Sequence, residues 1–332
     1  MTTHRERIES CLRGELPDRP PVALWRHFPM DDQSPENLAE AQLAFQRIYD
    51  FDLVKVTPAS SFCLKDWGVE DVWEGSTEGT RRYIKHVIIK PSDWEHLPVL
   101  DPSAPHLARQ LACLHQIRKG LEPETPFLQT IFNPLAQSKH LVAEDMLLVH
   151  LRKFPEAVMK GLETITKTTQ RFIEAAIKTG IDGIFYAVQH AQANLLTSDE
   201  FTNFSKTSDL ALLESASDLW CNMLHMHGKN IYFDVLSKYP VHILNWHDRE
   251  TDPSLSEALK GFKGILCGGL SRESLVFNKP EDIQGEAKDA FQQTNGKRLI
   301  LSTGCVVPII APHGNIQAAR FAGRQISKIR DR

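Results

Sequence analysis

The sequence predicts an α/β protein, a single (β/α)₈ barrel (TIM barrel) of parallel strands. Short apolar segments recur eight times along the 332 residues, and amphipathic helical segments separate most of them. The apolar runs are continuous, as expected for parallel strands that are buried on both faces. A doubly wound open sheet is the alternative architecture. However, no Gly-x-Gly-x-x-Gly motif follows the first strand, and no glycine-rich phosphate loop occurs elsewhere.

The N-terminal region is expected to begin with a helical extension. A short charged helix over residues 4–14 ends at a glycine, and the proline-rich turn at 17–21 leads into the first strand, 22–26. Pro35 predicts the start of a helix that continues to residue 50, because proline suits the first position of a helix.

A β excursion is expected after the second strand. This strand, 53–57, stops at Pro58. Residues 62–100 are rich in tryptophan, glycine and charge, and they include a strand-like run at 82–89. We interpret them as an excursion from the barrel that forms either a cap over the cleft or a dimer surface.

The remaining elements alternate in the order that a barrel requires. Further strands are expected at 127–132, 181–188, 221–227, 241–246, 264–268 and 298–302. Helices are expected at 103–119, once between 134 and 155, and at 155–179, 198–218, 234–237, 254–260, 272–276, 281–294 and 314–328. Gly180 is a typical residue for the end of a helix. The whole chain, 1–332, is therefore expected to form one domain.

The composition is typical of a soluble globular protein, with 42% hydrophobic and 24% charged residues. A net charge of -4 argues against a general nucleic-acid binder, which needs a clustered basic surface. The six cysteines show no paired spacing and are expected to be reduced thiols. The N-terminus lacks an apolar signal segment, and no apolar run is long enough for a membrane helix. We expect a cytoplasmic protein that acts on a small molecule.

The segment Leu224–Gly228 carries the strongest chemical signal. Side chains alternate along a strand, so His225 and His227 are expected to point to the same side. Cys305, near the end of a later strand, could add a thiolate to them. Two imidazoles and a thiolate suit a zinc ion and leave a fourth position for a substrate. The alternative is that the two histidines are a chance pair and that Cys305 is a buried apolar residue.

Other polar residues are expected at the same end of the barrel, where the chemistry of this fold takes place. Gln189 and His190 follow the fourth strand and either line the cleft or pack in the core. Asn245 and Trp246 could contact a flat ligand, although Trp246 could equally be core. For His247, the sequence allows support of a metal ligand or a solvated turn. His313 is the alternative metal ligand if His227 does not bind. These residues lie at or after the ends of three different strands: Gln189, His190, Asn245, Trp246, His247 and His313.

Blocks along nearly the whole chain resemble the uroporphyrinogen decarboxylase superfamily. The opening Arg5–Ile8 and Pro20–Arg26 are similar to the start of that family. Later matching blocks are Asn133–Ser138, Leu244–Trp246, Gly268–Leu270, Gly304–Cys305 and Pro312–Asn315. The resemblance implies a one-domain (β/α)₈ barrel with a deep cleft at the strand ends.

The chain departs from the decarboxylases of that superfamily. They carry an arginine-rich motif after the first strand and an aspartate at the end of the second, which together hold a tetrapyrrole. Here only Arg26 remains, the second strand ends without an aspartate, and His140 stands where the decarboxylases have a tyrosine. A decarboxylase of a tetrapyrrole or an aromatic carboxylate would use Arg26 as its anchor and His140 or His190 as its proton donor. The alternative for Arg26 is a surface ion pair.

The corrinoid-dependent methyltransferases of the superfamily are more similar to this chain. They bind zinc through a His-x-Cys-Gly block and a later Gly-Cys block. Here the first block reads His225-Met226-His227-Gly228 and the second Gly304-Cys305, so His227 replaces a cysteine. With one thiolate and two neutral imidazoles, bound zinc would keep a formal charge of about +1 and be a stronger Lewis acid.

The resemblance therefore implies a zinc-dependent methyltransferase that moves a methyl group between a corrinoid (cobalamin) and a thiol or a methyl ether. No corrinoid-binding block is evident in the chain, so we expect a partner protein to supply the corrinoid. The alternatives are the decarboxylase described above and a non-catalytic barrel that binds a tetrapyrrole or corrinoid. A homodimer is compatible with each of these.

Overall fold

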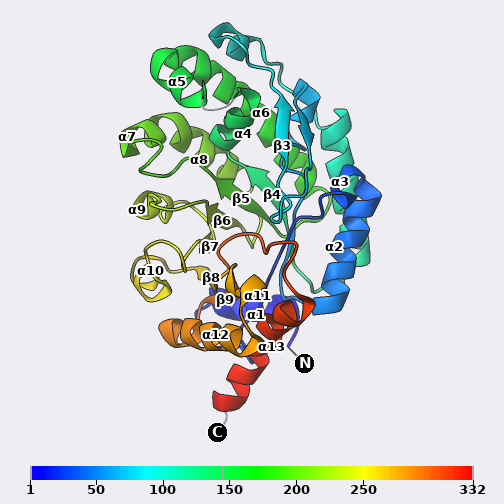
Figure 1. The fold of residues 1–332 in the computed structure, drawn as a ribbon, viewed down its shortest axis with the longest axis vertical. Coiled ribbons are helices and arrows are strands. Elements are labelled where there is room, and N and C mark those ends of the chain that lie inside the picture. The colour runs from blue at the N-terminus through cyan, green and yellow to red at the C-terminus, as the bar shows by residue number, and fades with distance from the viewer. Residues whose placement is uncertain (1, 144–145, 331–332) are drawn as a thin grey trace.

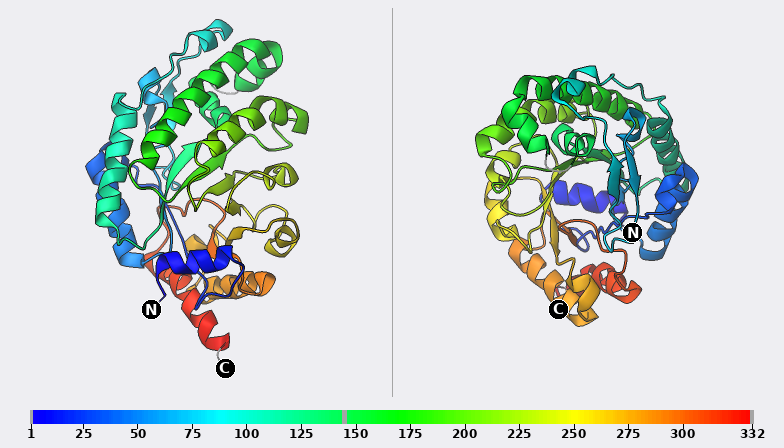
Figure 2. Two further views of the ribbon diagram at one scale, coloured as in Figure 1. Left: turned by 180° about the vertical axis from the view of Figure 1, so that it is seen from behind. Right: turned by 45° about the horizontal axis from the view of Figure 1, so that its top comes forward.

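Seven parallel strands form the central sheet of the computed structural model, which describes residues 2–143 and 146–330. Their spatial order is β1 (Val54–Val56), β4 (Phe127–Phe132), β5 (Gly183–Val188), β6 (Met223–Met226), β7 (Ile243–Trp246), β8 (Ile265–Leu270) and β9 (Leu299–Thr303). Almost every residue of these strands is buried. The sheet curls, and helices surround it (Figure 2, right). The predicted α/β barrel fold is confirmed.

An extended segment closes the ring between β9 and β1. Val22 forms a parallel bridge with Leu301, whose backbone N–H donates to the carbonyl of Pro21 at 2.9 Å. On the other side, Asp52 N–H donates to Val22 O at 2.8 Å, and the Asp52 carboxylate accepts from Val22 N–H at the same distance. The first strand was expected over 22–26, but only this bridge forms. The preceding prolines lack an N–H, and the Asp52 side chain takes the donor that a ladder would use.

The helices lie outside the sheet, apart from α1, which crosses its N-terminal end (Figures 1 and 2). Their bounds are α1 (His4–Leu12), α2 (Pro35–Tyr49), α3 (Pro105–Gly120), α4 (Pro134–Leu141), α5 (Met146–Lys153), α6 (Pro155–Ile177), α7 (Ser198–Phe201), α8 (Thr207–Glu214), α9 (Phe233–Leu236), α10 (Leu255–Gly261), α11 (Ser274–Phe277), α12 (Pro280–Thr294) and α13 (His313–Arg330). Short 3₁₀ helices span Asp31–Gln33, Lys65–Trp67 and Pro91–His96. None of the helices in the described residues has the length and apolar character needed to cross a membrane.

Two helical regions differ from the sequence prediction. Between residues 134 and 155 the structure has both α4 and α5 where one helix was expected. The helix expected over 198–218 is divided into α7 and α8 by a π-helical turn, Thr202–Lys206, and it ends at Glu214. Periodicity alone does not reveal either feature, because both leave the apolar side of the segment facing the core.

The side chains on the two faces of each strand pack in different apolar layers, one inside the barrel and one between the sheet and the helices. Met223 and Ile243 belong to the apolar cluster inside the barrel, which α1 closes from below through Ile8 and Cys11. Leu224 and Met226, like Leu244 and Trp246, belong to the outer cluster between sheet and helices. Since side chains alternate, His225 and Asn245 lie on the inner face, at the upper end of the interior.

The β excursion folds back over the C-terminal mouth of the barrel. It forms an antiparallel hairpin of β2 (Glu70–Val72) and β3 (Arg82–Lys85). In the connection between them, Thr77 O accepts from Ile309 N–H at 2.8 Å, and Glu78 pairs with Arg272 at 2.9 Å. The hairpin thus acts as a cap on the barrel, one of the two roles considered from the sequence.

Candidate metal centre

A cavity of about 240 Å³ opens at the C-terminal ends of the strands. Side chains from the barrel and from the β2–β3 hairpin line it together, including Trp25, His27, Lys55, Glu78, Arg81, Tyr83, Phe132, Lys139, His140, Phe185, Gln189, His225, His227 and Cys305. A barrel of this kind presents its reactive residues at this end. The cavity is therefore the candidate active site.

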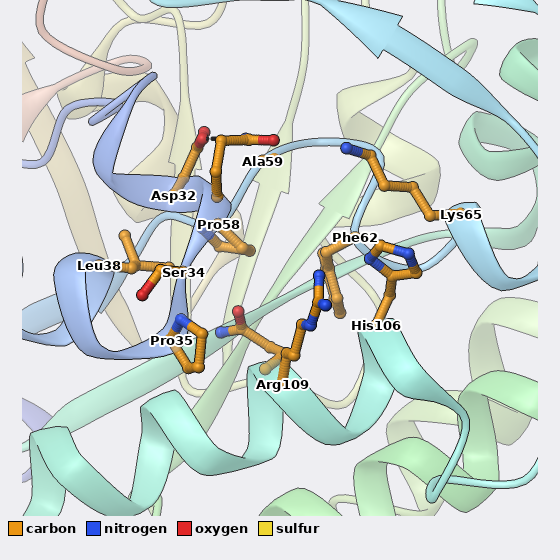
Figure 3. Close-up of a pocket in the computed structure, with 12 residues that line it drawn as sticks. Asp32, Ser34, Pro35, Leu38, Pro58, Ala59, Phe62, Lys65, His106 and Arg109 are labelled. Atoms are coloured by element: carbon orange, nitrogen blue, oxygen red, sulfur yellow. Dashed lines mark hydrogen bonds between the residues drawn. The ribbon is translucent and has the colours of Figure 1, made fainter.

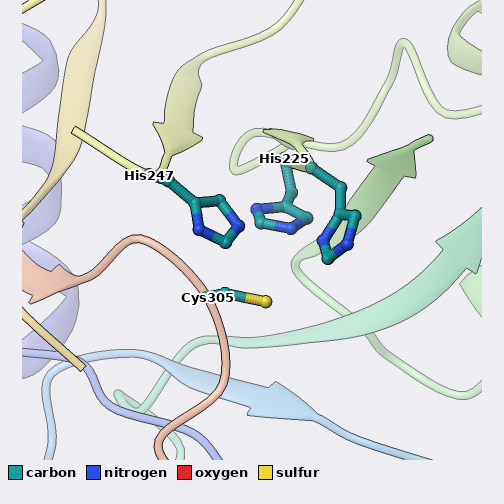
Figure 4. A group of neighbouring side chains, drawn as sticks. His225, His247 and Cys305 are labelled. Carbon is teal, nitrogen blue, oxygen red and sulfur yellow. The ribbon is translucent and has the colours of Figure 1, made fainter. Parts of the chain in front are cut away.

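Four potential metal ligands meet at one side of the cavity. The donor atoms of His225, His227, His247 and Cys305 all lie within 4.8 Å of one another. His225, His247 and Cys305 point toward a common centre (Figure 4). A tetrahedral zinc ion holds its donors roughly 3.3–3.8 Å apart, so a small inward movement of the side chains would suffice. Three imidazoles and a thiol therefore fit a zinc ion in both chemistry and spacing.

The ends of three strands, β6, β7 and β9, deliver these ligands. His225 lies within β6, and His227 follows its end, where its N–H still donates to Val188 O at 3.0 Å. His247 comes directly after β7. Cys305 comes two residues after β9, where a Cβ on Gly304 would lie 2.5 Å from the backbone of His247. Only glycine permits this approach, so Gly304 lets the loop carrying Cys305 lie against the end of β7.

Asn245 orients His225. The Asn245 Nδ2 group donates to Cys267 O at 2.8 Å and to Thr303 O at 3.0 Å, so its Oδ1 must face His225 as an acceptor. The distance from this Oδ1 to His225 Nδ1 is 2.6 Å. The proton of a neutral His225 is therefore held on Nδ1, and Nε2 is left with its lone pair for a metal.

Glu250 acts on His247 in a similar way. His247 Nδ1 lies 3.3 Å from Glu250 Oε1, which favours a proton on Nδ1 and again leaves Nε2 for the metal. From the sequence, His247 was considered as support for a metal ligand or as part of a turn. The structure instead places its ring among the candidate ligands, because β7 ends one residue earlier beside β6.

The electrostatics favour a thiolate at Cys305. Burial alone would raise the pKa of this thiol, but the surrounding imidazoles of His225, His227 and His247 hold it well below its ordinary value. Burial lowers the pKa of His225. Burial would do the same for His247, but its hydrogen bond to Cys305 and the charges of Cys305 and Glu250 raise its pKa, so zinc would have to displace a proton there. A thiolate next to neutral imidazoles is the protonation state that binds zinc.

Two of the predicted polar residues line the cavity, and a third lies next to them. Gln189 and His140 are lining residues, and the His140 ring stacks on Tyr83 with ring centres 4.0 Å apart. Burial lowers the pKa of His140 to about 3, so this ring is neutral near pH 7. His190 is buried with a left-handed φ of 66° and is not a lining residue. Burial lowers its pKa to about 4.

Besides His190, three predicted site residues do not line the cavity. The Arg26 guanidinium lies over the rings of Phe28 and Phe45, at 5.2 and 5.5 Å, because Trp25 and His27 take the inward positions of their segment. Trp246 is fully buried in the outer layer, where its Nε1 donates to Pro253 O. Asn245 is fully buried and bonded to His225, so it supports a candidate ligand where substrate contact was expected.

His313, the alternative ligand, lies elsewhere. This residue is at the start of α13, and its Nδ1 is 2.7 Å from the hydroxyl of Tyr49.

The residue that sequence reasoning missed is Lys55, which lines the cavity from β1. A lysine inside the apolar run 53–57 was the available signal, since a strand buried on both faces rarely carries an unpaired charge.

A second pocket, of about 110 Å³, lies between the start of α2, the loop after β1 and α3 (Figure 3). Its charged side chains include Asp32, Lys65 and Arg109. Lys65 pairs with Asp71 at 3.1 Å, and Asp32 pairs with Arg81. This pocket contains none of the four candidate ligands.

Comparison with known proteins gives two kinds of match. The family model described as uroporphyrinogen decarboxylase (URO-D) matches residues 3–325. A methyltransferase from Methanosarcina mazei is similar in structure, with a TM-score of 0.85 and 20% identity over 98% of this chain and 99% of its own. A B12-independent methionine synthase from Shewanella sp. W3-18-1 has a TM-score of 0.57 and 14% identity over 95% of both chains. A comparison with curated proteins found no match.

Proposed function

The chain belongs to the uroporphyrinogen decarboxylase (URO-D) family, and from this premise we propose that it is a zinc-dependent methyltransferase that works with a corrinoid protein. The observation that carries the proposal is the convergence of Cys305 and three imidazoles on one side of the cavity. The solved structures described as a methyltransferase and a B12-independent methionine synthase support the methyl transfer, and the corrinoid rests on the sequence resemblance.

The residues of the chain would divide the work as follows. Cys305 and two or three of the imidazoles of His225, His227 and His247 would hold zinc. A substrate thiol or methyl ether would take the open position, or a fifth one if all four donors bind, and the metal would lower the pKa of the thiol or polarise the ether oxygen. Asn245 and Glu250 keep two of the imidazoles in the tautomer that binds a metal. The cavity walls and the β2–β3 hairpin would position the substrate and limit the access of water.

The methyl carrier would be a corrinoid brought to the barrel mouth by a partner protein. The described cavity of about 240 Å³ suits a small molecule rather than a whole corrinoid, which supports docking at the mouth. Decarboxylation of a tetrapyrrole is less well supported, because Arg26, the expected carboxylate anchor, lies against Phe28 and Phe45 outside the cavity.

The first experiment is a measurement of metal content in the purified protein by elemental analysis. We expect about one zinc per chain, lost in His227→Ala and in Cys305→Ser. His96→Ala is the control, because this exposed histidine lies outside the cluster and should leave the zinc in place. Methyl transfer is then measured between methylated corrinoids and a series of thiols and methyl ethers.

Two results would contradict the proposal. A chain that takes up no zinc after reconstitution cannot use the centre as described. A zinc-loaded chain that moves no methyl group to or from any corrinoid in the presence of thiols or methyl ethers would remove the methyltransferase function while leaving the metal centre.

A further inference from the structure

Lys55 brings a buried amine into the cavity, and no carboxylate of the described residues faces it. Burial lowers its pKa to about 7, and the charge of Cys305 opposes this shift. Its side chain comes from β1, and the residue is 5% exposed. Its ammonium lies 3.3 Å from the hydroxyl of Thr57 and 4.7 Å from the centre of the Phe185 ring. Within residues 2–143 and 146–330, it has no carboxylate partner within the 4.0 Å limit of an ion pair. A buried ammonium is stable only with a counter-charge or with strong hydrogen bonds, and one hydroxyl supplies neither in full.

The other charged residues of the cavity leave an excess of positive charge. Arg81 is neutralised by Asp32, and Glu78 pairs with Arg272 at 2.9 Å. Lys139, exposed at the mouth, forms no ion pair with the described residues. Cys305 faces three imidazoles, and its negative charge also acts on Lys55. A metal bound to this thiolate would leave Lys55 without a counter-charge. The charges that remain for a ligand are therefore positive.

Aromatic rings connect Lys55 with the metal centre. The ring of Phe185 lies under the Lys55 ammonium and also stacks on His225, with ring centres 5.2 Å apart and an interplanar angle of 24°. Trp25 packs edge-on against Phe185 at 5.4 Å, and Phe132 and Tyr83 line the same cavity. A flat molecule that extends from Lys55 toward His225 would pass along these rings.

We propose that Lys55 is the binding site for a carboxylate of the substrate, and that the substrate is a small aromatic carboxylate. A single ammonium next to one hydroxyl suits a monovalent carboxylate better than a phosphate dianion, which usually takes several donors or a helix N-terminus. The reacting end of the molecule would face His225 and Cys305. That second statement rests on the proposed function, whereas carboxylate binding does not require the metal.

The test is calorimetric binding of two probes of the same shape, 4-methoxybenzoate and 4-methoxybenzamide, to the intact protein. The wild-type protein should bind the carboxylate more tightly than the amide. Lys55→Met, which keeps the length and apolar part of the side chain, should weaken binding of the carboxylate at least about tenfold and leave the amide unchanged. Lys55→Arg should restore most of the preference, and Lys139→Met should have a smaller effect because this residue is exposed.

The outcomes separate this inference from the proposed function. Cys305→Ser should lose zinc and methyl transfer but keep the preference for the carboxylate. Equal affinity for the two probes, no binding of either, or a Lys55→Met variant that keeps the wild-type preference would overturn the inference even if methyl transfer is found. If Lys55→Met does not fold, the comparison of the two probes on the wild-type protein decides.

Discussion

Asn245 Oδ1 lies 2.6 Å from Nδ1 of His225, and the amide of Asn245 is held in place by two backbone carbonyls from β8 and β9. One side chain thus joins three strands of the barrel to one imidazole of the candidate metal centre. Replacing it with leucine removes the acceptor while preserving the approximate volume. We expect Asn245→Leu to weaken zinc binding by roughly 10–100-fold, as is common when the hydrogen-bond partner of a ligand is lost.

Competition with a coloured chelator measures this effect. Trp246→Phe is the matched control, because Trp246 is the next residue on β7 but faces the outer layer. An Asn245→Leu protein that is folded and binds zinc as tightly as the wild type would show that the hydrogen bond to His225 does not support a metal.

His247 is predicted to be a metal ligand. It follows the end of β7, whereas His225 lies in β6. If all four donors bind, His247→Ala should reduce zinc affinity by more than the roughly 10–100-fold expected for a lost hydrogen-bond partner. His313→Ala should have no effect, since His313 bonds to Tyr49. Equal zinc affinity in the wild type and His247→Ala would restrict the ligands to His225, His227 and Cys305.

Cys305 is predicted to be the most reactive thiol once the protein is treated with a chelator. It is half-buried and lines the cavity, while the other five cysteines are buried. Burial raises the pKa of each of those five thiols, whereas the imidazoles keep the pKa of Cys305 low. Its thiolate should therefore persist as the pH falls, and alkylation should slow little between about pH 8 and about pH 6.

Iodoacetamide labelling followed by mass spectrometry locates the modified thiol. Zinc added before the reagent should protect Cys305, and Cys305→Ser should show no rapid labelling. Rapid labelling of a different cysteine, or labelling of Cys305 that zinc does not slow, would contradict the assignment.

Asp52 is predicted to be a main stabilising residue of the barrel closure. Its buried carboxylate accepts from Arg19 at 2.6 Å, from Arg7 at 3.1 Å and from the Val22 N–H. Removing the charge leaves buried guanidinium groups without a partner, so Asp52→Asn should lower the free energy of unfolding by about 3–5 kcal/mol. Asp18→Asn, which affects a half-exposed partner of Arg7, should cost less than about 1 kcal/mol.

The same carboxylate predicts how stability depends on pH. Burial alone would raise the pKa of Asp52, but hydrogen bonds from His4 and Arg19 and the charges of Arg19 and Arg320 lower it well below 3.8. A group whose pKa is lower in the folded chain stabilises the fold above its unfolded pKa and loses this effect as the pH falls through the folded value. Urea unfolding should thus show a loss of stability below about pH 3.8 that is smaller in Asp52→Asn. An unchanged acid dependence would contradict this role.

The apolar segments of the sequence were sufficient to locate the barrel. All eight expected strand positions are occupied, and seven of them are regular strands. The exception is the segment 22–26, whose pairing depends on the Asp52 side chain rather than on its own apolar pattern. The division of α7 and α8 by a π-helical turn also escaped prediction, because it does not change which face of the helix is apolar.

For the candidate site, local spacing placed His225 and His227 on one side of a strand, and the family resemblance added Cys305. The curvature of the closed sheet decided the rest. It brought His247 of the next strand to the same centre, directed Arg26 and Trp246 away from the cavity, and placed the Lys55 charge inside it. Alternation along a strand is a local property that a sequence displays directly. Which face points inward, and which strand ends meet, depends on contacts between residues far apart in the chain, and only the tertiary structure contains them.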